Sequence, residues 1–199
     1  MDLKTQKFEL EYAGRTLSLE TSRLAEQANA AVLGTYGNST VLATVVMGKK
    51  DKESGWFPLS VEYEERFYAA GKILGSRFVR REGKSSEEAV LSGRVIDRTI
   101  RPLFNQRMRR DVQVVVTILS YDEDDDLDFL ALTSASTALA ISDVPWDGPV
   151  AGVKIVQTKK GEMLINPKNS ELVDVNYQLF ASGPVDRINM IEAEGIEAS

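Results

Sequence analysis

The chain has 199 residues, 43% of them hydrophobic, which suits one generous globular domain with a sizeable core. It contains no cysteine and no histidine, so disulfides, thiol nucleophiles, the usual zinc sites and a Ser-His-Asp triad are all excluded. The net charge is -6, and any chemistry must use carboxylates, basic groups, hydroxyls or a carboxylate-bound ion.

The first third of the chain shows the alternation of apolar and polar residues that predicts β-strands. Residues 7–22 alternate on both sides of a turn at Ala13-Gly14, which predicts a hairpin. Residues 30–48 repeat the pattern around a Gly37-Asn38 turn, and Leu59, Val61 and Tyr63 alternate in a further strand. We therefore expect two hairpins followed by a single strand.

Two helices are predicted further along the chain. Ser85 followed by Glu88 is a capping-box pattern, and it predicts a helix from Ser86 to about Arg101, just before Pro102. Residues 128–142 are rich in small apolar residues and predict the second helix. The first helix is expected to be amphipathic. Its apolar face comprises Val90, Gly93, Ile96 and Ile100, and a stripe on another face comprises Arg94, Arg98 and Arg101.

Strands are expected between and after these helices. Residues 112–122 form a continuous β-branched run, which is typical of a buried strand. Residues 150–158, 162–166, 176–183 and 188–195 are shorter candidates. The predicted fold class is α+β, with a mixed sheet on which two main helices pack.

Charge is distributed unevenly along the chain. Between Lys72 and Arg110 there are eleven Lys and Arg against four Asp and Glu, a local balance of +7 in an acidic protein. Such a block suggests an anionic partner, although pairing of the arginines with acids elsewhere remains open. The acidic run from Asp122 to Asp126 is interpreted as a solvated loop, with a magnesium site as the alternative.

Two stretches resemble the polynucleotide phosphorylase family, specifically its first RNase PH-like domain. These are residues 65–104, including "ERFYAAGKILGSRFVRREGKSSE" and "RVIDRTIRPLF", and residues 135–155, "ASTALAISDVPWDGPVAGVKI". The resemblance covers nearly all of residues 1–199. It implies a parent protein that degrades RNA from its 3′ end by phosphate attack with magnesium, and that forms a homotrimeric ring. The family's second RNase PH-like domain, helical part, KH module and OB-fold module are absent from this sequence.

The resemblance also implies that this domain is not itself catalytic. The serine pair that binds phosphate in the family's active domain corresponds to Leu127 and Asp128, and the Asp-x-Asp strand corresponds to Asp174 and Asn176. An aspartate beside the phosphate position repels the anion, and a neutral amide cannot replace a carboxylate as proton donor or charged ligand. We expect no catalytic residue and no metal ligand here; magnesium and phosphate would belong to the parent protein.

A loop that contacts RNA in the ring channel of the family corresponds to the segment from Arg77 to Arg81. Arg80 and Arg81 match the family's arginine pair, and Phe78 matches one of its two aromatic residues, while Val79 replaces the other. Guanidinium groups bind phosphate oxygens and aromatic rings stack on bases. The predicted RNA-binding residues are Arg77, Phe78, Arg80, Arg81 and Lys84.

Arg94, Arg98 and Arg101 are assigned to internal or subunit contacts, because Asp97 and Arg101 already form an i, i+4 pair. Two other readings stay open: a purely structural ring subunit like the inactive subunits of the exosome, and a stand-alone RNase PH-type enzyme. Expected partners are single-stranded RNA, further copies in the trimer and components of an RNA degradosome. With no apolar segment of membrane-spanning length, we expect a cytoplasmic location and no membrane contact.

Overall fold

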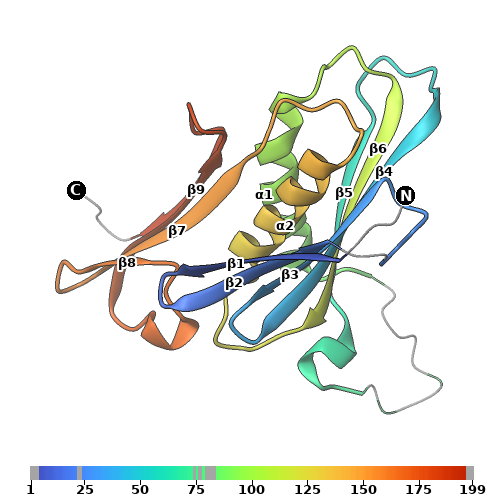
Figure 1. Cartoon of the computed structure of the whole chain (residues 1–199). Coiled ribbons are helices and arrows are strands. Elements are labelled where there is room, and N and C mark those ends of the chain that lie inside the picture. The colour runs from blue at the N-terminus through green and yellow to red at the C-terminus, as the bar shows by residue number, and fades with distance from the viewer. Residues whose placement is uncertain (1–4, 22–23, 74, 76–77, 79–83, 196–199) are drawn as a thin grey trace.

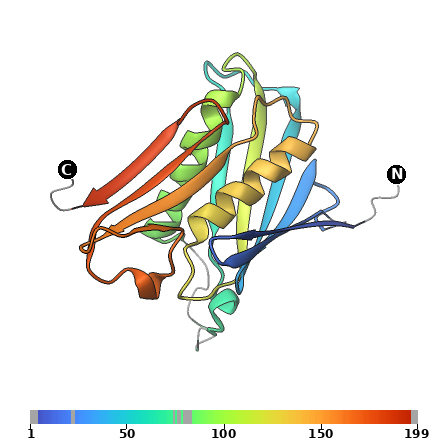
Figure 2. The same ribbon diagram turned by 60° about the vertical axis from the view of Figure 1, so that its left-hand side comes forward.

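The computed structural model describes residues 5–21, 24–73, 75, 78 and 84–195. Figure 1 shows two helices lying against a large sheet, and Figure 2 shows that a second, smaller sheet covers their other side. The layers are therefore sheet, helices, sheet. The predicted α+β class with two main helices is confirmed, and the strands divide between two sheets where the sequence predicted one.

The larger sheet has six strands in the order β1-β2-β3-β4-β6-β5. Only β5 and β6 pair in parallel, so the sheet is mixed as predicted. Both predicted hairpin turns are present, with left-handed backbone at Ala13, Gly14 and Gly37. The strands are β1 (Gln6–Tyr12), β2 (Arg15–Thr21), β3 (Ala30–Tyr36), β4 (Ser39–Asp51), β5 (Leu59–Glu64) and β6 (Arg110–Ser120).

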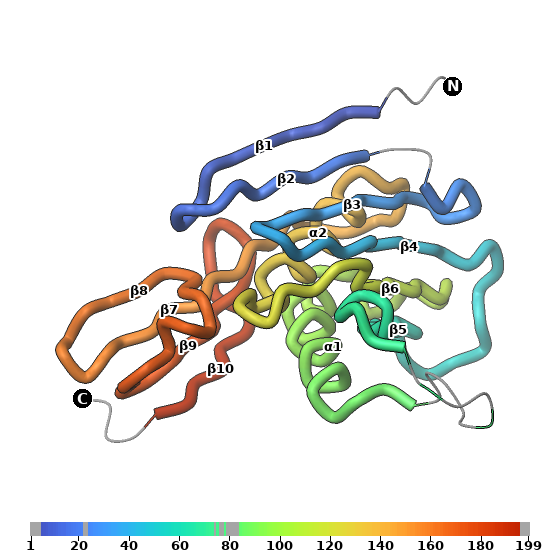
Figure 3. The backbone as a smooth tube through the Cα atoms, turned by 90° about the horizontal axis from the view of Figure 1, so that it is seen from below, coloured from blue at the N-terminus to red at the C-terminus, as the bar shows by residue number. Residues whose placement is uncertain are grey.

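The smaller sheet is formed by the last part of the chain, and all its strands pair antiparallel in the order β10-β9-β7-β8. Its strands are β7 (Ala151–Thr158), β8 (Met163–Ile165), β9 (Val175–Gly183) and β10 (Met190–Gly195). Three short 3-10 helices join the elements: η1 (Phe67–Ala70), η2 (Arg101–Leu103) and η3 (Asn169–Glu171). Seen along the sheets in Figure 3, the two strand layers lie on opposite sides of the helices.

Helix α1 (Glu87–Ile100) begins one residue later than the capping-box pattern suggested. Ser86, and not Ser85, is the N-cap, and its side chain accepts a 2.9 Å hydrogen bond from the backbone N–H of Ala89. The apolar face is also rotated, because Val90 is 51% exposed while Ala89 and Val95 are buried. The assignment of Val90 to the buried face was therefore wrong.

Helix α2 (Leu127–Ile141) is apolar around most of its circumference because it lies between the two sheets. Close approach to both sheets depends on glycine. A Cβ at Gly34 of β3 would collide with the side chain of Ser134, and one at Gly152 of β7 would lie 2.8 Å from the Leu132 side chain of α2. Gly34 and Gly152 thus allow α2 to pack closely between the two sheets, and this packing fixes the position of its N-terminus.

No helix in the described part of the chain is long and apolar enough to cross a membrane.

Candidate functional site

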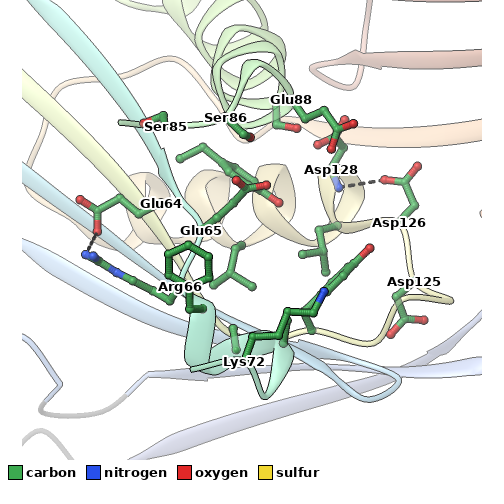
Figure 4. A pocket seen from close by; sticks show the side chains of 18 of the residues that line it. Glu64, Glu65, Arg66, Lys72, Ser85, Ser86, Glu88, Asp125, Asp126 and Asp128 are labelled. Atoms are coloured by element: carbon green, nitrogen blue, oxygen red, sulfur yellow. Dashed lines mark hydrogen bonds and ion pairs between the residues drawn. The ribbon is translucent and has the colours of Figure 1, made fainter. Parts of the chain in front are cut away.

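A pocket of about 840 Å³ opens where the N-termini of the two helices converge (Figure 4). One wall is η1 with the end of β5, and the opposite wall is the first turn of α1 and the start of α2. Basic, acidic and aromatic side chains share its lining. They include Glu65, Arg66, Phe67, Lys72, Lys84, Ser86, Glu88, Tyr121, Asp126 and Asp128.

The N-terminus of α2 is closed by its own carboxylates. Asp126 is the N-cap and accepts a 3.0 Å hydrogen bond from the backbone N–H of Asp128. The other oxygen of Asp126 lies 2.6 Å from Nζ of Lys154 on β7. Helix N-termini attract anions through exposed N–H groups and the helix dipole. Here a bonded side-chain anion already occupies this position.

The acidic run is a structural junction, which corrects its interpretation as a solvated loop. Asp125 is buried, 2.6 Å from the Arg15 guanidinium and 2.8 Å from the Ser39 hydroxyl. Asp124 accepts a 2.7 Å hydrogen bond from the backbone N–H of Ser170. The carboxylates thereby connect the first hairpins, α2 and η3.

A metal ion does not fit this junction. Within residues 5–21, 24–73, 75, 78 and 84–195, no group of three or more Asp or Glu is arranged to hold one. Several of the run's oxygens are already engaged by Arg15, Ser39, Lys154 and backbone N–H groups.

Asp128 sits in the pocket with an unfavourable charge. Burial and the neighbouring Asp126 carboxylate raise the pKa of Asp128 to about 6, against a smaller lowering by the Ser92 hydrogen bond and Lys154. An acid whose pKa is raised in the folded protein stabilises the folded state relative to the unfolded state only while it is protonated. Its contribution is complete below about pH 3.8 and is lost as pH rises through about 6.

We predict that Asp128→Asn raises the free energy of unfolding at pH 7.5 by about 1–2 kcal/mol, since the ionised form is disfavoured in the fold. The gain should vanish at pH 4, where the native aspartate is itself protonated. Urea unfolding at both pH values measures it, with the exposed Asp147→Asn as the control. A variant that is less stable at pH 7.5, or equally affected at both pH values, contradicts the assignment.

The structure separates the four residues predicted to occupy degenerate catalytic positions. Leu127 and Asp128 line the pocket. Neither Asp174 nor Asn176 does: Asp174 precedes β9, where its carboxylate lies 3.1 Å from Nζ of Lys159 at the far end of β7. These positions therefore do not converge on one site in this domain.

The predicted RNA loop is described only in part. Arg77, Arg80 and Arg81 lie outside the described residues. Phe78 is 85% exposed, and Lys84 is exposed and lines the pocket. Of the predicted RNA-binding residues that the structure describes, Lys84 therefore lies at the pocket.

The arginine stripe of α1 divides into two kinds of residue. Arg101 forms the predicted pair with Asp97, with N–O 2.5 Å, and also donates to the Leu59 carbonyl at 3.1 Å. Arg94 and Arg98 are exposed, and neither forms an ion pair with a residue that the structure describes. Arg101 is structural, while the other two face solvent.

Several pocket residues were not predicted as site residues. Arg66 lines the pocket and lies 2.5 Å from Glu64. Glu65 and Tyr121 were not singled out, and Glu88 was noted only for the capping-box pattern, because the three come from segments that only the folded chain brings together. The only local signal was the helix start at Ser85 and Ser86, which places Glu88 at the pocket.

Comparison with known proteins defines the class. A model described as "3′ exoribonuclease family, domain 1" (RNase PH) matches residues 13–145. The chain belongs to this family. The crystal structure of rice (Oryza sativa) Rrp46 has the same fold, with a TM-score of 0.72 at 14% identity over 92% of this chain and 81% of that one.

Curated relatives narrow the class further, and three of them are named polyribonucleotide nucleotidyltransferase. The protein of Exiguobacterium sibiricum is 48% identical over 199 residues, which is 100% of this chain and 27% of that protein. That of Thermomicrobium roseum is 49% identical over 96% of this chain and 24% of its own length. That of Shouchella clausii is 46% identical over 97% of this chain and 27% of its own. The chain thus spans about a quarter of these relatives.

Proposed function

We propose that this chain acts as the RNA-guiding first RNase PH-like domain of a polyribonucleotide nucleotidyltransferase and does not itself catalyse phosphorolysis. The parent protein would degrade RNA from its 3′ end in the cytoplasm, releasing nucleoside diphosphates. Its phosphate and magnesium sites would lie in the second RNase PH-like domain. Assembly as a homotrimeric ring and contact with degradosome components belong to the same proposal.

The observation that carries the non-catalytic role is the N-terminus of α2. A phosphate there would need the exposed N–H groups and positive end of the helix. Asp126 already accepts the Asp128 N–H, and Asp128 adds a second carboxylate at the same place. Phosphate would meet two like charges in a partly buried site, which opposes its binding.

RNA guiding is supported by the residues on either side of the loop arginines. Phe78 is an exposed ring, Lys84 is an exposed ammonium group at the pocket, and Arg80 and Arg81 lie between them in the sequence. Ring stacking and phosphate pairing hold single-stranded RNA with little sequence preference and strong salt dependence. Binding of this kind suits a single-stranded RNA that must slide along the protein.

Phosphorolysis can be measured directly on the native chain. We predict no release of nucleoside diphosphate from poly(A) above a protein-free blank, with inorganic phosphate and magnesium both present. A full-length polyribonucleotide nucleotidyltransferase serves as the positive control. Phosphate-dependent product from this chain would favour a stand-alone enzyme and refute the non-catalytic role.

A second candidate function is assembly alone. Its support is the exposure of Arg94 and Arg98 on α1, where neither forms an ion pair with the described residues. Such arginines suit a carboxylate-bearing surface of a neighbouring subunit. This candidate predicts that RNA affinity does not depend on the loop arginines. Equal RNA binding by the native chain and the Arg80→Ala, Arg81→Ala variant would support it.

A further inference from the structure

The pocket between η1 and the helix N-termini contains two carboxylates that have no partner among the residues that the structure describes. Glu65 follows β5, and Glu88 is in the first turn of α1. Within the described residues, neither side chain forms an ion pair or a hydrogen bond. The neighbouring Glu64 and Asp126, in contrast, are bonded to Arg66 and Lys154. In Figure 4 Glu88 lies at the first turn of α1, and Glu65 lies in the lining on the β5 side of the pocket.

Aromatic rings complete this part of the lining. Tyr121 is 38% exposed and Phe67 is 39% exposed, and both line the pocket. Their segments are tied together, because the backbone N–H of Tyr121 donates to the Ala69 carbonyl at 2.9 Å. Burial, followed by Glu123, Glu88, Asp126 and Glu65, raises the pKa of Tyr121. Both Glu65 and Glu88 are thus among the acids whose charge raises the pKa of Tyr121.

The chemistry of this lining selects among ligands. Asp126, Asp128, Glu65 and Glu88 oppose a phosphate, and the described residues hold no group fitted to a metal ion. A flat neutral ring that carries N–H donors fits both the aromatic rings and the carboxylates of the lining. It can stack on an aromatic side chain while its N–H groups donate hydrogen bonds to carboxylates. Cytosine, adenine and guanine carry amino groups on their pairing edges, and carboxylates accept from such groups. Uracil has a carbonyl oxygen in place of the amino group and keeps only its ring N–H as a donor on that edge.

We propose that this pocket binds one nucleobase of the guided RNA by its amino-bearing edge, with Glu65 and Glu88 as acceptors and Tyr121 as the stacking surface. The inference rests on the proposed function, because the adjoining loop from residue 78 to Lys84 would deliver the strand. Binding at this pocket would add a preference among bases to RNA binding that is otherwise independent of sequence. In this proposal the pocket contacts a base, and the loop contacts the phosphates.

Neutral nucleosides test the pocket separately from the loop, because they carry no phosphate. Binding of cytidine and uridine to the native chain is followed by NMR shifts of the Tyr121 and Phe67 ring signals. The two nucleosides differ at the base by an amino group against a carbonyl. We expect cytidine to bind about five- to tenfold more tightly than uridine, and guanosine more tightly than inosine, which lacks the 2-amino group.

The Glu65→Gln, Glu88→Gln double variant should bind cytidine and uridine with similar affinity. Glu87→Gln is the matched control: Glu87 is exposed in the same helical turn but does not line the pocket, so selectivity should be kept. Equal affinity of the native chain for cytidine and uridine, or unchanged selectivity in the double variant, would overturn the proposal. Absence of any nucleoside shift up to the solubility limit would do the same.

The two proposals fail in different ways. An Arg80→Ala, Arg81→Ala variant should lose RNA affinity and keep cytidine selectivity, because its substitutions lie in the loop. If RNA affinity is unchanged in that variant while the native chain still selects cytidine, guiding by the loop is wrong and the base pocket stands. If RNA affinity falls but the native chain does not select cytidine, only the pocket proposal is wrong.

Discussion

Replacing Asp125 by alanine is expected to lower the free energy of unfolding by about 3–5 kcal/mol, the cost typical of breaking one side of a buried ion pair. Asp125 accepts from Arg15 at 2.6 Å and from the Ser39 hydroxyl at 2.8 Å, and both acid and arginine are nearly enclosed. Without the carboxylate, Arg15 would keep a charge held over the Tyr36 ring at 4.1 Å, with only the Asn166 carbonyl as hydrogen-bond acceptor.

Urea unfolding at pH 7 measures this change. The control is Glu123→Ala in the same acidic run, where the side chain is 81% exposed and the loss should stay within about 0.5 kcal/mol. The double variant Arg15→Ala, Asp125→Ala should be less destabilised than the sum of its single changes, because neither charge is then left alone. A loss below about 1 kcal/mol for Asp125→Ala would show that the junction contributes little.

Features set by neighbouring residues were predictable from the sequence. The hairpin turns at Ala13-Gly14 and Gly37-Asn38 lie where the alternation breaks, and both are present. The start of α1 shows the limit of prediction from neighbouring residues. Ser85 and Ser86 are adjacent and chemically alike, and only the backbone geometry selects Ser86 as the cap. Packing against the sheet likewise decides that Ala89 is buried and Val90 exposed.

Features set by distant residues were not predictable in the same way. The acidic run has the composition of a solvated loop, but its partners Arg15, Ser39 and Lys154 come from three other strands. Composition cannot show such pairing, because it is created only when the sheets close around α2. For the same reason Glu65 and Tyr121 could not be assigned to one pocket before the fold was known.

The division into two sheets was missed for a related reason. The four late strands alternate much as the early ones do, and each was located close to its observed bounds. Nothing local indicates that β7 pairs with β9 rather than with β6. The sheet boundary follows from α2, whose apolar surface requires cover on two sides.

The central claim is that the loop arginines hold RNA in this domain. Arg80 and Arg81 would each neutralise a phosphate, and each such contact on a single strand adds about 0.7 to the slope of log affinity against log salt. Loss of both should weaken binding of a short RNA at low salt by at least about tenfold, given about 1.5 kcal/mol or more for charged hydrogen bonds.

The most direct test is fluorescence anisotropy of a labelled oligo(A) at several salt concentrations, with native chain and the Arg80→Ala, Arg81→Ala variant. An Arg94→Ala, Arg98→Ala variant removes the same charge from the exposed face of α1 and serves as the control. We predict that the loop variant loses at least about tenfold in affinity and about 1.4 in salt slope, while the control changes little. Equal RNA affinity of the native chain and the loop variant would contradict the account.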